Sequence, residues 1–253
     1  MKSHLPLVLI AFGMAGLGTA PVSRAEAPNA PGNSEALAST IPSDSNHRMH
    51  PDWNRGCEDR LAAMQGKRCD VIFIGDSITD MWNGPGRAVW DHYYAGRHAL
   101  NFGVGGDKTQ NVVWRLDTWA VRAFKPKVAV VLIGTNNIGD RAEAIAGGVK
   151  AVLAKTGQLY PGARVILVSI LPRAEQPEKV TKVDQLIRAF ADEQTVFYCD
   201  LAARMTPQGD TWTGLGPDRL HLGPEGYALW AAEMEPLLAR LLGETPLPPG
   251  SGS

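Results

Sequence analysis

Four short polar blocks contain the residue types that a serine-dependent acyl transfer requires. They read GDSI (75–78), NFGVGGD (101–107), GTNN (134–137) and DRLH (218–221). A serine hydroxyl is a poor nucleophile until a base removes its proton in the transition state. A histidine can be that base, and an aspartate can orient it and stabilise the imidazolium that forms. The four blocks therefore contain candidates for a nucleophile, a base and a carboxylate.

The four blocks resemble, in this order, the sequence blocks of the SGNH, or GDSL, hydrolase superfamily. The resemblance covers the chain from about residue 70 to residue 241. Within the superfamily, ALNFGVGGDKTQNVVWRL, KPKVAVVLIGTNN and DRLHLGPEGY are most similar to the branch of platelet-activating-factor acetylhydrolase catalytic subunits and their secreted bacterial relatives. A single block would be a weak signal, but four in this order are specific.

The resemblance implies a catalytic triad of Ser77, His221 and Asp218. Ser77 would be the nucleophile and His221 the base that takes its proton. Asp218, three residues before His221, would orient the imidazole from the same turn. Taken singly, Ser77 and Asp218 could instead cap helices. Together with His221 they favour the catalytic interpretation.

Acyl transfer also needs hydrogen-bond donors for the oxyanion, and the resemblance implies three of them. They are the backbone N–H of Ser77, the backbone N–H of Gly106 and the side-chain amide of Asn136. Gly106 is chosen because the family's donor immediately precedes the polar residue of this turn, and Gly105 is the alternative. Asp76, beside the nucleophile, is interpreted as a structural residue of its loop and is left out of the site.

Alternating strands and helices must position these blocks. Short runs rich in Val and Ile predict five buried strands, and helically periodic segments lie between them. Nearly continuous apolar strands separated by helices favour a parallel sheet that is covered on both faces. We therefore expect a single α/β domain with a three-layer, doubly wound, five-stranded parallel sheet, the flavodoxin-like fold that the resemblance also implies. The predicted strands are 71–74, 99–102, 128–133, 165–171 and 196–199.

The composition of both ends of the chain predicts segments that do not belong to this domain. Residues 1–25 combine a positive start, an apolar run and small residues, which is typical of a secretory signal peptide; an uncleaved N-terminal anchor is the alternative. Residues 26–48 predict a disordered linker, 49–243 the hydrolase domain and 244–253 a disordered tail. We expect a secreted or periplasmic protein without stable membrane insertion after signal cleavage.

Composition and spacing exclude several function classes. With 25 Lys and Arg against 26 Asp and Glu, the chain has no basic footprint for DNA or RNA, and we expect no nucleic-acid partner. The glycine-rich stretch 103–109 fits neither a phosphate loop nor a dinucleotide fingerprint, and His47 and His50 lack further metal ligands. We therefore expect no metal and no cofactor. Cys57 and Cys69 form either a disulfide or two buried free thiols.

These observations predict a serine esterase that removes a short acyl group, acetyl above all, from a small ester or an acetylated glycan. A lysophospholipase or thioesterase on the same fold is the alternative among enzymes, and a non-catalytic carbohydrate-binding protein is the alternative outside them. The segment 201–217 consists mostly of small, polar and helix-breaking residues, so no amphipathic lid is expected there. Trp212 in this segment is expected to contact the substrate, with packing as the alternative.

Overall fold

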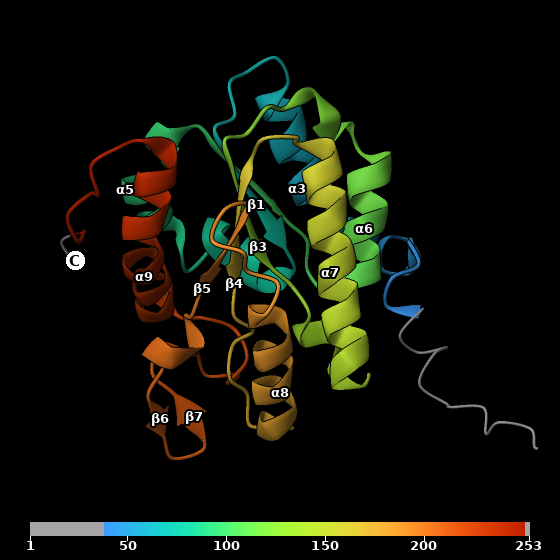
Figure 1. The fold of residues 1–253 in the computed structure, drawn as a ribbon, viewed down its shortest axis with the longest axis vertical. Helices are drawn as coiled ribbons and strands as arrows, with labels where there is room; N and C mark the ends of the chain where they lie inside the picture. Colours follow the sequence, from blue (N-terminus) through green and yellow to red (C-terminus); the bar gives the residue numbers. More distant parts are fainter. Residues whose placement is uncertain (1–37, 251–253) are drawn as a thin grey trace, which may run out of the picture. The chain divides into compact units, whose positions relative to one another are not determined.

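The computed structural model describes residues 38–250, which contain a five-stranded parallel sheet (Figure 1). The strand order is β2-β1-β3-β4-β5, so the chain runs from β1 to one edge and then winds to the other. This confirms the predicted doubly wound α/β fold. The fourth strand is shorter than expected, because the apolar run continues past it as a buried loop. The strands are β1 (Val71–Gly75), β2 (Ala99–Gly103), β3 (Val128–Leu132), β4 (Arg164–Val168) and β5 (Val196–Cys199).

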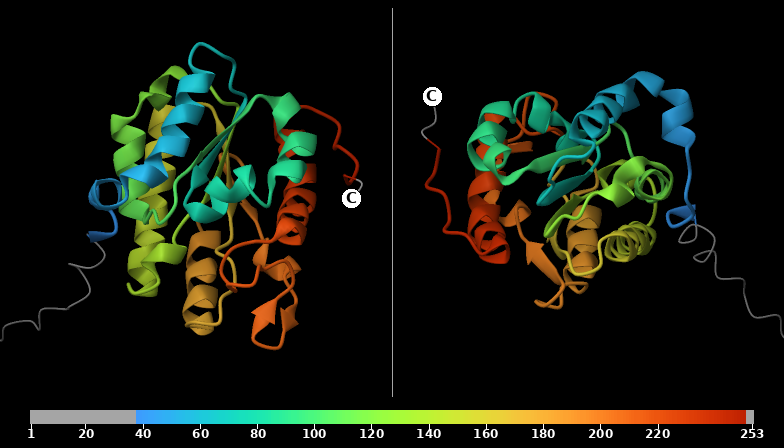
Figure 2. Two further views of the ribbon diagram at one scale, coloured as in Figure 1. Left: turned by 180° about the vertical axis from the view of Figure 1, so that it is seen from behind. Right: turned by 90° about the horizontal axis from the view of Figure 1, so that it is seen from above.

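Helices cover both faces of the sheet and complete the three predicted layers (Figure 2). The long helices are α3 (Pro51–Met64), α5 (Arg87–Tyr93), α6 (Thr109–Thr118), α7 (Ala142–Leu159), α8 (Pro177–Arg188) and α9 (Pro224–Leu242). Successive strand residues point to opposite faces. On β1, Ile72 and Ile74 pack with α3, α6, α7 and α8, whereas Val71 and Phe73 pack with α5 and α9.

The core under α5 and α9 is rich in aromatic side chains. Trp90 and Tyr94 lie 5.2 Å apart between ring centroids, and Trp82 lies 5.0 Å from Trp230 and 4.5 Å from Tyr227. Trp90 and its neighbours therefore pack around the first helices after β1.

Short elements complete the described part of the chain. No helix within residues 38–250 is long and apolar enough to cross a membrane. The strands β6 (Pro207–Gln208) and β7 (Thr211–Trp212) form a small antiparallel hairpin. The short α-helices are α2 (Ser45–Met49) and α4 (Ser77–Asp80). The 3-10 helices are η1 (Met81–Asn83), η2 (Ala95–Arg97), η3 (Ala120–Ala123), η4 (Thr135–Asn137) and η5 (Ala202–Arg204).

The described part of the predicted linker is ordered, which corrects the expectation for residues 38–48. This segment contains α2, and Ser39 and Asn46 are buried in it. The Ser43 N–H donates to the Gln110 carbonyl at 3.1 Å. Hydrogen bonds hold this segment with few apolar contacts, so hydrophobic periodicity could not predict it. Residues 1–37, which include the predicted signal peptide, lie outside the described residues.

The described part of the predicted tail also has defined contacts. Residues 244–250 form no helix or strand, but Glu244 accepts a hydrogen bond from Arg97 at 2.8 Å, and the Leu247 N–H donates to Glu235 at 2.7 Å. Arg97 forms a buried ion pair with Glu235 at 2.6 Å. The tail is therefore fixed to α9 and η2 by charged groups. Residues 251–253 lie outside the described residues.

Cys57 and Cys69 are free, buried thiols, and the disulfide alternative is not realised. Cys57 packs into the core from α3, and the Cys69 thiol donates to the Val71 carbonyl at 3.4 Å. Burial raises the pKa of Cys57 to about 11 and that of Cys69 to about 12. Both side chains therefore behave as small apolar core residues.

Candidate active site

The carboxyl ends of three strands bring three of the polar blocks to one edge of the sheet. Gly75 at the end of β1 pairs with Gly103 of β2 and with Leu132 of β3, so the chain leaves all three strands at the same level. A Cβ atom on Gly75 would lie 2.3 Å from the Leu132 carbonyl oxygen, and only glycine allows this close approach. α4 begins directly afterwards with Ser77 as its first residue.

Two contacts fix the turn that presents Ser77. The Asp76 carboxylate accepts the Ile78 N–H at 3.0 Å and so caps α4. From α9, the Tyr227 hydroxyl donates to the Ile78 carbonyl at 2.6 Å. Asp76 is completely buried, and this burial raises its pKa to about 7. Asp76 thus has the structural role that its sequence position predicted.

Ser77, His221 and Asp218 form a continuous chain of hydrogen bonds. Ser77 Oγ lies 2.7 Å from His221 Nε2, and His221 Nδ1 lies 2.7 Å from Asp218 Oδ2. Both distances are in the normal range for strong hydrogen bonds. The tautomer with its proton on Nδ1 donates to Asp218 and leaves Nε2 free to accept the serine proton. The structure therefore brings the three predicted triad residues into the order nucleophile, base and carboxylate.

The loop before α9 holds Asp218 and His221 on one turn. Asp218 Oδ1 accepts the N–H of Leu220 at 3.0 Å and the N–H of His221 at 2.9 Å. The Gly216 N–H donates to the His221 carbonyl at 2.8 Å. Partial burial acts to raise the pKa of Asp218, but the hydrogen bonds from the His221 ring and from these N–H groups outweigh it and hold that pKa below its usual value. Asp218 is therefore an ionised partner for an imidazolium.

The predicted oxyanion donors belong to residues that line the same pocket as Ser77. The Ser77 N–H is at the start of α4, where a helix offers it no partner. Gly106 has φ +71°, a conformation that favours glycine, and its N–H has no backbone partner within residues 38–250. Asn136 Nδ2 donates to the Asp107 carbonyl at 2.9 Å, which leaves its second N–H for a ligand. Gly105 and Gly106 both line the same pocket.

Comparison with known proteins assigns the family. Residues 73–229 match the GDSL-like Lipase/Acylhydrolase family. The chain belongs to this family. Among its relatives, the platelet-activating factor acetylhydrolase IB subunit alpha1 of Pongo abelii is 36% identical over 190 residues, which are 73% of this chain and 81% of the relative. The chain is therefore a GDSL-family ester hydrolase.

Solved structures share the GDSL-family fold. A GDSL-like lipase from Bacteroides thetaiotaomicron superimposes with a TM-score of 0.63 at 17% identity, over 74% of this chain and 97% of that protein. A carbohydrate esterase family 3 protein from Talaromyces cellulolyticus superimposes with a TM-score of 0.51 at 19% identity, over 70% of this chain and 99% of that protein. At these identities the likeness concerns the fold.

The GDSL-family site opens into a pocket of about 400 Å³, a volume suited to a small ligand. Trp53 forms part of its wall, and the sequence pattern did not predict this. No local sequence pattern marks this role; in the structure Trp53 lies outside the buried stripe of α3 and is 46% exposed. Trp212 does not line the pocket and packs against the core under α9, which corrects its expected substrate contact. The lining residues are Trp53, Ser77, Asp80, Met81, Gly105, Gly106, Asn136, Leu220 and His221.

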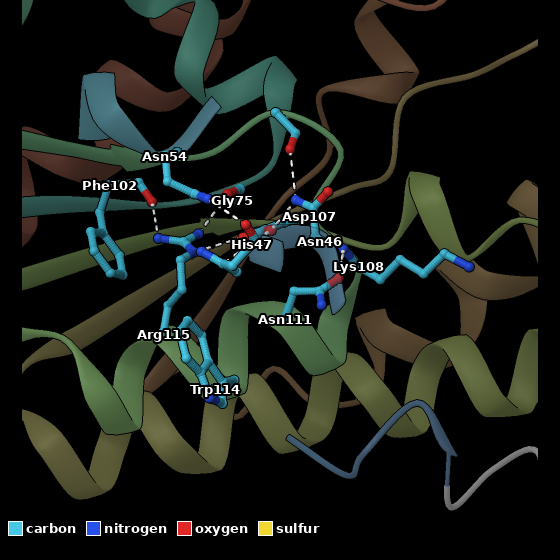
Figure 3. A network of polar contacts seen from close by, with 12 residues as sticks. Asn46, His47, Asn54, Gly75, Phe102, Asp107, Lys108, Asn111, Trp114 and Arg115 are labelled. Atoms are coloured by element: carbon cyan, nitrogen blue, oxygen red, sulfur yellow. Dashed lines mark hydrogen bonds and ion pairs between the residues drawn. The ribbon is translucent and has the colours of Figure 1, made fainter. Parts of the chain in front are cut away.

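A buried ion pair supports the glycine turn of the GDSL-family site (Figure 3). Arg115 Nε donates to Asp107 Oδ2 at 2.6 Å, and neither side chain is exposed. The guanidinium also donates to the carbonyls of Phe102 at 3.0 Å and Gly75 at 3.2 Å. Arg115 thus connects the ends of β1 and β2 with the turn. A charged residue within the apolar face of α6 was the sequence signal for this role.

His47 is a packing residue near this ion pair. Its ring centroid lies 4.6 Å from that of Trp114 and 5.3 Å from that of Trp119. Burial, with the Arg115 charge as a second cause, lowers the pKa of His47 to about 4, so its ring is neutral at pH 7. Within the described residues, no group of three or more His, Cys, Asp or Glu side chains could hold a metal ion.

Proposed function

We propose that this chain is a secreted or periplasmic serine esterase that releases short acyl groups, acetyl above all, from an alcohol. The observation that carries the proposal is the chain of hydrogen bonds from Ser77 through His221 to Asp218 at the edge of the pocket. The relative from Pongo abelii is named an acetylhydrolase, which supports acetyl as the acyl group that is released. The structural likeness to a carbohydrate esterase makes an acetylated glycan a suitable candidate for the alcohol part.

In the first half of the reaction, Ser77 Oγ attacks the acyl carbonyl carbon while His221 Nε2 takes the serine proton. Asp218 stabilises the imidazolium that results. The carbonyl oxygen becomes an oxyanion and accepts hydrogen bonds from Ser77 N–H, Gly106 N–H and Asn136 Nδ2. His221 then gives its proton to the leaving alcohol, and the acyl group stays on Ser77.

In the second half, water replaces the alcohol. His221 removes a proton from the water, whose oxygen attacks the acyl carbonyl carbon, and the same three donors stabilise the second oxyanion. The bond to Ser77 breaks, the serine oxygen recovers its proton from His221, and the carboxylic acid leaves. The residues of this chain thus supply every proton transfer of the cycle.

The pocket walls support a short acyl group. Trp53, Met81 and Leu220 provide apolar surface beside Ser77, but the cavity measures only about 400 Å³. Each methylene group that cannot be buried forfeits about 0.8 kcal/mol of binding free energy. Any part of a long acyl chain that extends beyond these walls would leave its apolar surface in water.

A substrate panel tests the proposed function. We expect kcat/KM for p-nitrophenyl esters to be highest from acetyl to butyryl and to fall steeply by octanoyl, and we expect acetate release from acetylated glycans. The Ser77→Ala variant provides the blank for both assays. Faster turnover of palmitoyl than of acetyl esters would instead support the lysophospholipase alternative, because it would require an apolar groove.

The cellular location is tested separately by the mature N-terminus. We expect expression in a bacterial host with an intact export pathway to yield a periplasmic protein that begins near residue 26, as the predicted signal peptide requires. Intact-mass measurement identifies the first residue. Recovery of the full chain from the cytoplasm alone would contradict secretion.

A further inference from the structure

The segment 38–53 lies upstream of the region that matches the GDSL family, yet it contacts the glycine turn at 105–107. Asn46 of α2 makes the central contact (Figure 3). Its Nδ2 donates to the Gly105 carbonyl at 2.9 Å and to Asp107 Oδ1 at 2.6 Å. Asn46 is 5% exposed. Both N–H groups of this amide are therefore used on the turn that carries Gly106.

Asp107 links Asn46 to the rest of the oxyanion hole. One carboxylate oxygen of Asp107 accepts from Asn46, the other accepts from Arg115, and its backbone carbonyl accepts from Asn136. The Asp107 N–H donates to the Val104 carbonyl at 3.4 Å. A shift of this residue would therefore move Asn136 as well as the preceding Gly106. Without Asn46, Asp107 Oδ1 would lose its only side-chain hydrogen bond within the described residues.

Trp53, at the other end of the same segment, covers the turn from outside. A Cβ atom on Gly106 would lie 2.5 Å from the indole, so Gly106 and Trp53 are in close contact. The indole is stacked on the His50 ring, with 3.9 Å between centroids and 11° between planes. The segment thus holds the turn by hydrogen bonds at one end and by packing at the other.

We propose that Asn46 is a positioning residue for the oxyanion hole. It fixes the Gly105–Gly106–Asp107 turn and, through it, the Gly106 N–H and the Asn136 amide. This inference rests on the proposed function, because it assumes that these donors face an oxyanion. Donors of this kind are effective only when they are held in place before the reaction, and a displacement of about 1 Å can cost about 10²-fold in rate.

Asn54 provides a matched control in the same part of the chain. It is also an asparagine that is 5% exposed, and its Nδ2 donates to the carbonyls of His47 at 3.5 Å and His50 at 3.3 Å. Within residues 38–250, its side chain makes no hydrogen bond with the turn at 105–107. Loss of either amide removes two hydrogen bonds from the segment 38–53, but only Asn46 reaches the oxyanion hole.

The first test compares Asn46→Ala with Asn54→Ala by steady-state kinetics on p-nitrophenyl acetate and by thermal unfolding. We expect both variants to melt at a lower temperature. We expect kcat and kcat/KM of Asn46→Ala to fall together by about 10- to 100-fold with KM nearly unchanged, because the lost interaction acts in the transition state. Asn54→Ala should retain kcat within about threefold. Wild-type kcat in Asn46→Ala, or an equal loss in Asn54→Ala, overturns the proposal.

Two further variants separate positioning from folding. Asn46→Asp keeps the side-chain volume but places a carboxylate against Asp107 Oδ1, and we expect it to lose at least as much kcat as Asn46→Ala. Asn46→Ser keeps one donor, and we expect an intermediate kcat, which also serves if Asn46→Ala does not fold. If kcat of Asn46→Ser, calculated from the concentration of folded protein, equals the wild-type value, the proposal is wrong.

A double-variant cycle tests the route through the turn. Because Asn46 also locates Asn136, we expect the combined kcat loss of Asn46→Ala and Asn136→Ala to be smaller than the product of the separate losses. Fully multiplicative losses would contradict the route. Ser77→Ala keeps this outcome distinct from the proposed function: activity in that variant refutes the esterase mechanism, whereas an inactive Ser77→Ala with an unaffected Asn46→Ala refutes only the positioning role.

Discussion

A serine hydroxyl is a weak nucleophile, and in the proposed mechanism the groups around Ser77 activate it. His221 accepts its hydrogen bond, and an ionised Asp218 holds the imidazole in the required tautomer. The resemblance of the polar blocks located these residues in the sequence. It located neither Asn46 nor Trp53, because the contacts of these two residues with the glycine turn depend on a long-range arrangement of the chain that leaves no local pattern.

Removal of the Asn136 amide tests its proposed role as an oxyanion donor. We expect Asn136→Ala to lower kcat by about 10²- to 10³-fold with a much smaller change in KM, because the oxyanion forms only after the attack. Steady-state kinetics on p-nitrophenyl acetate measures both constants. Asn137→Ala is not a suitable control, since Asn137 accepts the Thr109 N–H at 2.9 Å and is fully buried. Asn83→Ala serves instead, because this exposed asparagine does not itself line the pocket and its amide donates to the Asp80 backbone carbonyl at 2.9 Å. An unchanged kcat in Asn136→Ala would remove Asn136 from the site.

At the scale of elements, the sequence predicted the five strands because buried parallel strands are almost continuously apolar. All five residues of β1 and all five of β3 are buried. The segment 38–48 did not follow this rule. Its order depends on hydrogen bonds from residues such as Asn46, and polar residues without periodicity predict disorder when their partners are unknown.

Asp184 of α8 should make the stability of the protein depend on pH. Its carboxylate accepts the Ile170 N–H at 2.8 Å, and burial raises its pKa to about 7 from 3.8. Between about pH 4 and pH 7 the folded protein therefore keeps a proton that the unfolded chain has released, and this group's contribution to stability is lost as the pH rises. Asp184→Asn keeps an acceptor oxygen and carries no charge. We expect its free energy of unfolding, relative to the parent, to be higher at pH 7.5 than at pH 4.5.

Denaturant titrations of both proteins at the two pH values measure this difference. Asp76, with its pKa raised to about 7, and His47, with its pKa lowered to about 4, titrate in the same range. Their contributions cancel because variant and parent are compared at each pH. A difference between the two proteins that does not change with pH would contradict the assigned protonation of Asp184.

At the scale of the whole molecule, two cores on either side of the sheet hold the site edge in place. Each core also contains cysteine side chains, with Cys57 and Cys69 in one and Cys199 in the other. The sequence left the state of Cys57 and Cys69 open, since spacing alone does not fix the distance between two thiols. The structure accounts for both as packed apolar groups.

The reactivity of the three thiols can be predicted from their burial. We expect three thiols to react with Ellman's reagent when the protein is unfolded without a reductant, because all three cysteines are free. In the folded protein we expect slow reaction, since burial raises the pKa of Cys57 to about 11 and the pKa of Cys69 and of Cys199 to about 12. A single reactive thiol in the unfolded, unreduced protein would indicate a disulfide.

Labelling with a fluorophosphonate tests the proposed role of Ser77 as nucleophile. Such a reagent bonds to an activated serine, so mass spectrometry of the digested adduct identifies the residue that carries it. We expect a single label on Ser77 in proportion to lost activity, no label on folded Ser77→Ala, and activity in that variant below about a hundredth of wild type. A label on another serine, or an unlabelled Ser77 in inactivated enzyme, would contradict it.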